Sequence, residues 1–122
     1  MTLTTLTIHE SHQKLKNKEI SATELTQAFL DRIDQLDNQI KSYISLCPEF
    51  ALSQAKHLDN TILKKSSFPT LTGIPLAPKD IYLTKDIPTT CGSKILKNYY
   101  PPYQSTVIQK CLDQHAIILG KT

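Results

Sequence analysis

The sequence predicts an α/β fold in which helices pack over a sheet. Stretches with apolar residues at three- and four-residue steps alternate with short, uniformly apolar runs, and this alternation is typical of helices packed over a sheet. The length of 122 residues fits one domain. No internal repeat or low-complexity segment interrupts the pattern.

Two capping boxes predict that the chain opens with two helices. Thr7 pairs with Glu10 at the start of the first, and Ser21 pairs with Glu24 at the start of the second. The apolar stripe of the second helix packs on the rest of the fold or, alternatively, binds a partner chain. The residues expected on the buried faces are Ile8 and Leu15 in the first helix and Leu25, Ala28, Phe29, Ile33, Leu36 and Ile40 in the second.

The remaining elements are predicted to alternate between strand and helix. Residues 43–47 form a short strand, Pro48 opens a third helix, and residues 71–78 lead into a strand that ends near Lys79. Ser105 is expected to cap a fourth helix, followed by a buried strand over residues 116–119. The apolar faces comprise Leu52, Ala55, Leu58 and Ile62 in the third helix and Val107, Ile108, Cys111, Leu112 and His115 in the fourth.

Composition excludes several classes of function. The formal charge of +3 comes from scattered residues, so direct nucleic-acid binding is not expected. Three cysteines without metal-site spacing indicate free thiols in a reducing compartment. We find no secretory leader pattern and no apolar run of membrane-spanning length, and therefore expect a soluble chain of the cytoplasm or an organelle matrix.

Lys79 is the candidate catalytic residue, because it stands where an apolar strand-like stretch ends, and catalytic groups are often found at such ends. The alternative is a solvent-facing lysine. Four segments, the first of which contains Lys79, resemble the amidase signature family in their order and spacing, most of all the A subunits of aspartyl/glutamyl-tRNA amidotransferases. They are residues 73–80, 84–93, 101–107 and 117–122.

The resemblance implies that residues 1–122 are the amino-terminal part of one amidase signature domain, incomplete at the carboxyl end, with the first helices and strands of a mixed sheet covered by helices. Such enzymes use a serine nucleophile, a second serine with a cis peptide bond, and a lysine that acts as base through that second serine. Lys79 matches the lysine, whereas both serines of the family lie downstream of Thr122. Lysine serves as a base near neutral pH only where its surroundings lower its pKa, so we expect these residues alone to be inactive.

The resemblance also implies partners. The complete subunit would release ammonia from glutamine for a complex with companion subunits B and C, which amidates mischarged glutamyl-tRNA with ATP and magnesium. The tRNA would be bound by the complex rather than by this segment, and no cofactor is expected in this chain. A different amidase signature amidohydrolase and a non-catalytic remnant or interaction module are the two alternatives.

Three other motifs have a weaker claim to function. The ending Gly120-Lys121-Thr122 matches part of a phosphate-binding loop, but an apolar strand precedes it. His9 and His12 lie one helical turn apart, and solvated histidines are more plausible than metal ligands. Residues 89–93 are small and polar, which suits either an ordinary turn or a turn that supports a substrate site.

Four positions depart from the family pattern. Asp86 and His115 stand where the family usually has glycine, so both are expected to be strained if the backbone there has positive φ. Pro78 replaces an aliphatic residue and removes an amide donor just before Lys79, which is acceptable only where a sheet ladder ends. Gln104 replaces a usual aspartate. These changes affect fine geometry around Lys79.

Overall fold

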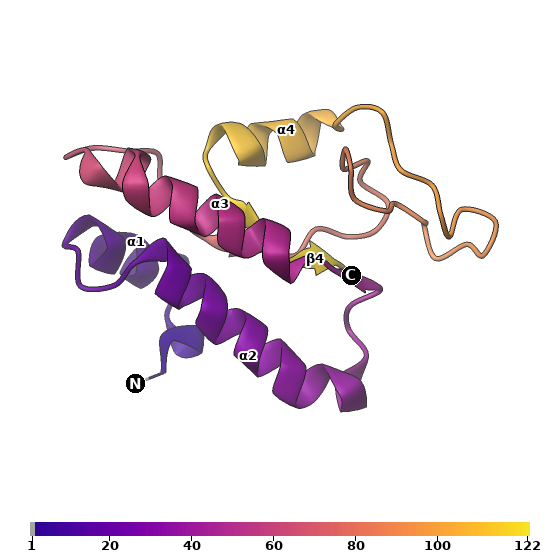
Figure 1. Cartoon of the computed structure of the whole chain (residues 1–122), viewed down its shortest axis with the longest axis horizontal. Helices are drawn as coiled ribbons and strands as arrows, with labels where there is room; N and C mark the ends of the chain where they lie inside the picture. The colour runs from indigo at the N-terminus through magenta and orange to yellow at the C-terminus, as the bar shows by residue number, and fades with distance from the viewer. Residues whose placement is uncertain (1) are drawn as a thin grey trace.

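The computed structural model describes residues 2–122 and packs helices against two small two-stranded sheets, one parallel and one antiparallel (Figure 1). The predicted fold class and the order of helices and strands are confirmed. The elements are η1 (Leu3–Thr5), α1 (Ile8–Lys16), α2 (Ala22–Ile40), β1 (Ser45–Leu46), α3 (Pro48–Asn60), η2 (Ile62–Lys64), β2 (Pro75–Leu76), α4 (Thr106–Asp113), β3 (Ile117–Ile118) and β4 (Gly120–Lys121).

The segment that contains β3 and β4 contributes one strand to each of the two sheets. β3 pairs in parallel with β2, with Pro75 opposite Ile117, and β4 pairs antiparallel with β1, with Ser45 opposite Lys121. A long loop between β2 and α4 extends away from the helices (orange in Figure 1). The two sheets therefore join three segments that are far apart in the sequence, and the loop after β2 starts at the end of the parallel pair.

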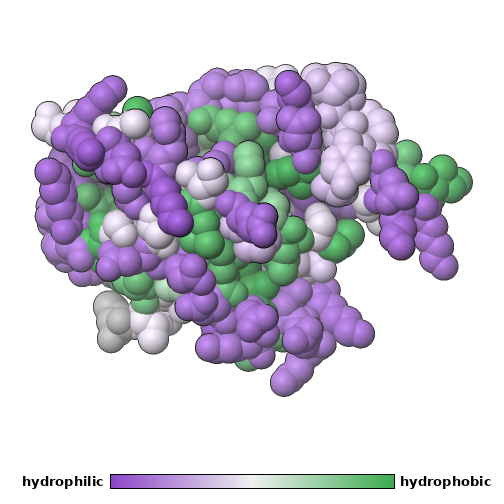
Figure 2. Space-filling view, in the orientation of Figure 1, coloured by the Kyte–Doolittle hydropathy of each residue, from purple (hydrophilic) through white to green (hydrophobic). Residues whose placement is uncertain are grey.

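Alternate residues of the central segment face opposite layers, as the strand period of two requires. Ile117 and Leu119 belong to the larger apolar core that α1, α2 and α3 cover. Ile118 belongs to a smaller cluster with Ile87 and with Ile108 of α4. Apolar side chains also gather across the middle of one face of the molecule, with polar groups around them (Figure 2).

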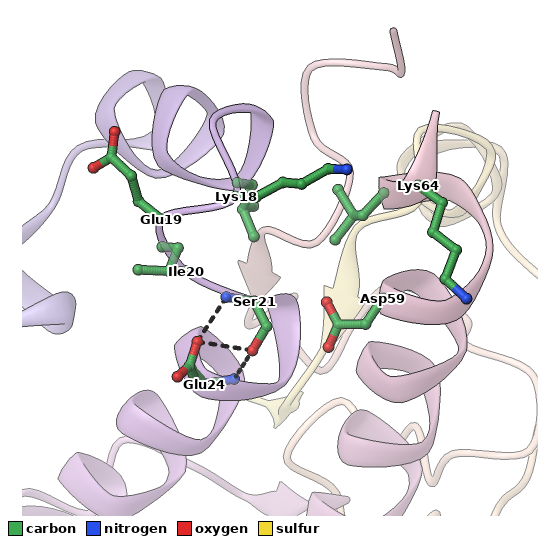
Figure 3. A pocket seen from close by; sticks show the side chains of 9 residues that line it. Lys18, Glu19, Ile20, Ser21, Glu24, Asp59 and Lys64 are labelled. Carbon is green, nitrogen blue, oxygen red and sulfur yellow. Dashed lines mark hydrogen bonds between the residues drawn. The ribbon is translucent and has the colours of Figure 1, made fainter. Parts of the chain in front are cut away.

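The two predicted capping boxes are both present. Thr7 and Ser21 each accept a backbone N–H from the glutamate three residues later and donate their own backbone N–H to its carboxylate. These hydrogen bonds from the cap backbone lower the pKa of both glutamates, Glu10 and Glu24. The second box is drawn in Figure 3. Local sequence therefore determines where α1 and α2 begin.

Asp59 of α3 adds a tertiary cap to the start of α2. Its carboxylate accepts the backbone N–H of Ala22 at 2.7 Å and of Thr23 at 3.0 Å, and the Thr23 hydroxyl at 2.6 Å. Asp59 reaches from α3 into a hollow of about 420 Å3 between the end of α1 and η2 (Figure 3). The contact joins α3 to the positive end of the α2 dipole.

Several side chains depart from the predicted faces. The exposed fractions of Ile8, Ile40 and Val107 are 54%, 64% and 52%, because these residues lie in the first or last turns of their helices, beyond the packed middle. Ser105 does stand at the cap position of α4, but its side chain accepts no hydrogen bond there. His115 is not on α4: it follows the helix, in a turn.

Candidate active site

The backbone of Lys79 is held tightly while its side chain is exposed. The carbonyl of Pro78 accepts the N–H of Thr122 at 3.1 Å, and the N–H of Asp80 donates to the carbonyl of Thr122 at 2.7 Å. The Lys79 carbonyl accepts the N–H of Tyr82 at 3.1 Å, which closes a turn. The side chain therefore projects from a fixed backbone position after β2, near the strand end that the sequence predicts.

Pro78 fits this position because the ladder does not need its missing donor. The N–H of Leu119 bonds the carbonyl of Leu76 at 2.9 Å. In a regular parallel ladder, the N–H of residue 78 would then bond the carbonyl of Leu119. That carbonyl accepts instead from Cys47 on the other side, at 2.9 Å. The departure from the family pattern at Pro78 thus leaves no backbone group unpaired at Leu119.

Lys121 is the second cation of this region, and its side chain is fully buried. Its Nζ donates to the carbonyl of Tyr82 at 2.6 Å, to Oγ1 of Thr84 at 3.0 Å and to Oγ1 of Thr89 at 3.2 Å. These three acceptors match the three protons of an ammonium. The Asp80 carboxylate lies 3.7 Å away and balances the charge.

Asp80 joins Lys121 to the turn at residues 89–93. Its Oδ2 accepts the backbone N–H of Thr90 at 3.0 Å and also a short hydrogen bond from the Thr90 hydroxyl. Its backbone carbonyl accepts the N–H of Cys91 at 2.9 Å. The small, polar turn predicted at residues 89–93 is therefore a turn, and it also supports the segment that carries Lys79.

Burial sets the electrostatics of this cluster. Loss of water around the ammonium lowers the pKa of Lys121, and the charge of Asp80 opposes that shift. Burial raises the pKa of the Cys47 thiol to about 11. Cys91 is exposed, has a positive φ of 51°, and no base is bonded to it in the described part of the chain.

The two positions where the family usually has glycine do adopt the left-handed backbone. Asp86 has φ 62° and His115 has φ 61°. Aspartate tolerates this region better than most residues. The side chain of Gln104 accepts the N–H of Lys85 at 2.9 Å, so it holds the start of the turn that contains Asp86.

Two of the three weaker motifs, residues 120–122 and the histidine pair, form no ligand site among residues 2–122. Gly120 and Lys121 lie in β4, and a Cβ at Gly120 would meet the Ser45 carbonyl at 2.2 Å, so the glycine allows two strands to approach. His9 is exposed, whereas His12 is half-buried and packs edge-to-face on Phe68 with ring centroids 5.2 Å apart, which corrects the expectation of two solvated histidines. The described residues contain no group of three metal-ligating side chains.

Sequence reasoning did not identify the role of Lys121. The signal was present, because the buried-type run 116–119 continues directly into Gly120 and Lys121, and a lysine that continues a buried strand needs a counter-charge. The partner of Lys121 could not be predicted, because Asp80 is 41 residues away.

An open groove of about 440 Å3 lies beside this cluster and is lined by Ile44, Ser45, Pro88, Thr90, Gly92, Ser93, Lys94 and Lys97.

Comparison with known proteins places this geometry in context. Residues 24–122 match the family model described as Amidase. The chain is 52% identical over 116 residues to the A subunit of glutamyl-tRNA(Gln) amidotransferase from Geobacter sp. strain M21, and 50% identical over 115 residues to that of Microcystis aeruginosa. These alignments cover 95% and 94% of this chain and 24% of each relative.

A solved structure shows the same arrangement. The native peptide amidase from Stenotrophomonas maltophilia superposes with a TM-score of 0.88 at 30% identity, over 97% of this chain and 24% of that protein. The chain therefore spans about a quarter of the length of the curated relatives and of the enzyme that it matches. In residues 2–122, no helix has both the length and the apolar content that a membrane crossing requires.

Proposed function

The chain belongs to the amidase family, and on that premise we propose that it is the amino-terminal part of the A subunit of a glutamyl-tRNA(Gln) amidotransferase. The complete subunit would hydrolyse glutamine in the cytoplasm and pass ammonia to companion subunits B and C, which amidate glutamyl-tRNA with ATP and magnesium. The identity of 52% with the Geobacter relative is the observation that carries this proposal.

Within this proposal, Lys79 is the catalytic base and acts through the second serine of the family. The support is geometric: the backbone of Lys79 is fixed by Thr122 on both sides, and its amine is exposed at the end of the sheet, where a further part of a domain can cover it. Covering would remove water from the amine and favour its neutral form. The chain alone does not provide that enclosure.

Exposed apolar groups just before β1, in β1 and at the start of α3 support a further contact surface. Ile44, Leu46 and Phe50 lie within seven residues and are 54%, 45% and 49% exposed, and neighbouring exposed apolar groups are typical of surfaces that contact other chain segments or partner proteins. We assign this surface to the remainder of the amidase domain or to a companion subunit. The tRNA would be bound elsewhere in the complex.

A hybrid subunit tests the proposal. Residues 1–122 are joined to the remaining three quarters of the Geobacter relative and expressed with its companion subunits, and ammonia release from glutamine is measured together with Gln-tRNA formation. We expect activity in the hybrid and a loss of about 10²-fold or more in Lys79→Met, the range of general-base contributions. Lys56→Met, on the exposed face of α3, is the matched control and should keep its activity.

Other outcomes select the alternatives. A folded hybrid that hydrolyses small amides but not glutamine would indicate a different amidase signature amidohydrolase, a reading that the likeness to peptide amidase favours. A folded hybrid with no hydrolysis, together with capture of the companion subunits by residues 1–122, would indicate an interaction module. Full activity in Lys79→Met would remove the assigned base.

A further inference from the structure

The pairing around Lys79 contains a one-residue irregularity. The N–H groups of Ile117 and Leu119 bond the carbonyls of Ile74 and Leu76, two residues apart on each side. The next bond joins the N–H of Thr122 to the carbonyl of Pro78, so the central segment advances by three residues while its partner advances by two. This is the register of a β-bulge, which bends a strand and redirects a side chain.

The bulge has a clear structural result. It brings Thr122 opposite Lys79, while Lys121 is fully buried under the loop that follows β2. Gly120, the residue before Lys121, lets β4 approach the carbonyl of Ser45 closely. Thr122, which is hydrogen-bonded to the backbone on both sides of Lys79, therefore directly follows the buried Lys121 in the chain.

The acceptors of Lys121 all lie in one loop. Tyr82, Thr84 and Thr89 provide a carbonyl and two hydroxyls within 3.2 Å of Nζ. Tyr82 is also the residue whose N–H closes the turn on the Lys79 carbonyl. One ammonium thus bonds two stretches of this loop, one three residues after Lys79 and the other ten residues after it.

Asp80 connects the same cation to the backbone beside Lys79. Its carboxylate binds Thr90 and faces Lys121, and its backbone N–H and carbonyl bond Thr122 and Cys91. Every polar group of Asp80 except Oδ1 is hydrogen-bonded, and Oδ1 is the oxygen that faces the ammonium. A neutral side chain at residue 121 would leave this buried carboxylate without a counter-charge.

We propose that Lys121 is a positioning residue for Lys79: its buried ammonium ties Tyr82, Thr84, Thr89 and Asp80 together and so fixes the strand end from which the Lys79 amine projects. Lys121 acts through structure, since its Nζ has no access to solvent or to a substrate. This inference rests on the proposed function only in assigning the base to Lys79. The placement of the loop by Lys121 can be tested without activity.

The first measurement uses the 122-residue chain and needs no substrate. Amide hydrogen exchange is compared between the unmodified chain, Lys121→Met and Thr84→Val, after circular dichroism has shown that each is folded. We expect Lys121→Met to speed exchange about tenfold or more at the N–H groups of Thr90 and Cys91, with no change at Leu25 in α2. Unchanged protection at Thr90 and Cys91 would overturn the proposal.

Thr84→Val keeps the measurement decisive if Lys121→Met does not fold, because it removes a single acceptor of the ammonium. We expect a smaller acceleration at the same two amides, Thr90 and Cys91, again with no change at Leu25. Equal acceleration throughout the chain would show general destabilisation and would also count against a local role.

The second measurement uses the hybrid subunit. We expect Lys121→Met to lower kcat for glutamine about 10²-fold with little change in KM, the effect of a misplaced catalytic group. The double variant Lys79→Met/Lys121→Met should lose no more activity than Lys79→Met, because a residue that acts through Lys79 has no effect without it. Multiplied losses would overturn the inference.

The two proposals fail in different ways. If Lys79→Met keeps its activity, the assignment of the base is wrong, and the exchange measurement alone decides the role of Lys121. If Lys79→Met loses activity while Lys121→Met keeps its kcat, the proposed function stands and the positioning role is refuted.

Discussion

Replacement of Gly120 by alanine should break the pairing between β1 and β4. A Cβ at this position would lie 2.2 Å from the Ser45 carbonyl oxygen and 2.9 Å from Cα of Leu46. Cβ contacts under 3.0 Å essentially never occur, so the strands must separate by about 0.8 Å at the carbonyl. Both obstructing atoms belong to the backbone, and a rotamer change cannot relieve the clash.

The size of the effect follows from the hydrogen bonds on either side of the clash. The N–H of Ile44 bonds the carbonyl of Lys121 at 2.8 Å, and the N–H of Cys47 bonds that of Leu119 at 2.9 Å. Weakening two bonds costs about 0.5–1.5 kcal/mol each, and the strain of an inserted methyl group is typically about 1–3 kcal/mol. We expect Gly120→Ala to lose about 2–6 kcal/mol in the free energy of unfolding.

Urea unfolding followed by circular dichroism measures this loss, with Gly92→Ala as the matched control. Gly92 has φ +68° and no heavy atom within 4 Å of an added Cβ, so its substitution tests backbone strain without a clash. That strain is worth about 1–2 kcal/mol. The reasoning is refuted if Gly120→Ala costs no more than Gly92→Ala.

Four further outcomes are expected. Asp59→Ala should lose about 1–3 kcal/mol of unfolding free energy because three donors at the start of α2, two of them from Thr23, lose their acceptor; an unchanged urea midpoint would refute the cap. Alkylation of Cys47 should stay slow at pH 8 and accelerate as the pH approaches its pKa of about 11, whereas exposed Cys91 should react at pH 8, as mass spectrometry after pulsed labelling will show. Because folding raises the Cys47 pKa from 9.0, the folded chain keeps its proton longer, and the stability should fall between pH 9 and about 11. Asp86→Val should cost about 1–2 kcal/mol at φ 62°, with Asp86→Gly as the unstrained control, in the same urea assay.

The helices were predictable because their signals are local. The capping boxes at Thr7 and Ser21 determine two helix starts within four residues, and Pro48 opens α3 as expected. Ser105 shows the limit of such signals: the residue stands at the cap position, but its hydroxyl is buried without a hydrogen bond. A cap position is a property of the sequence, whereas the rotamer of the cap depends on its neighbours.

The arrangement around Lys79 was predictable only in part. The sequence and its resemblance to a family place Lys79 at a strand end, and the structure has it there, exposed after β2. The bulge that buries Lys121 could not be foreseen, because it depends on the register between residues some 40 positions apart. Register is set by the packing of both faces of a sheet, and a sequence pattern specifies one strand at a time.

The central place of residues 117–121 has a consequence for the order of folding. β1 and β2 have no pairing with each other among the described residues, and both pair with this later segment, across 76 and 42 positions between Ser45 and Lys121 and between Pro75 and Ile117. Contacts at such separation form slowly because a long loop must close first. During synthesis, the helical hairpin of α2 and α3 can assemble early. β1 and β2 stay unpaired until residues 117–121 have been synthesised. Until then both edges are open to other chains, so slow translation upstream of residue 117 should favour association over folding.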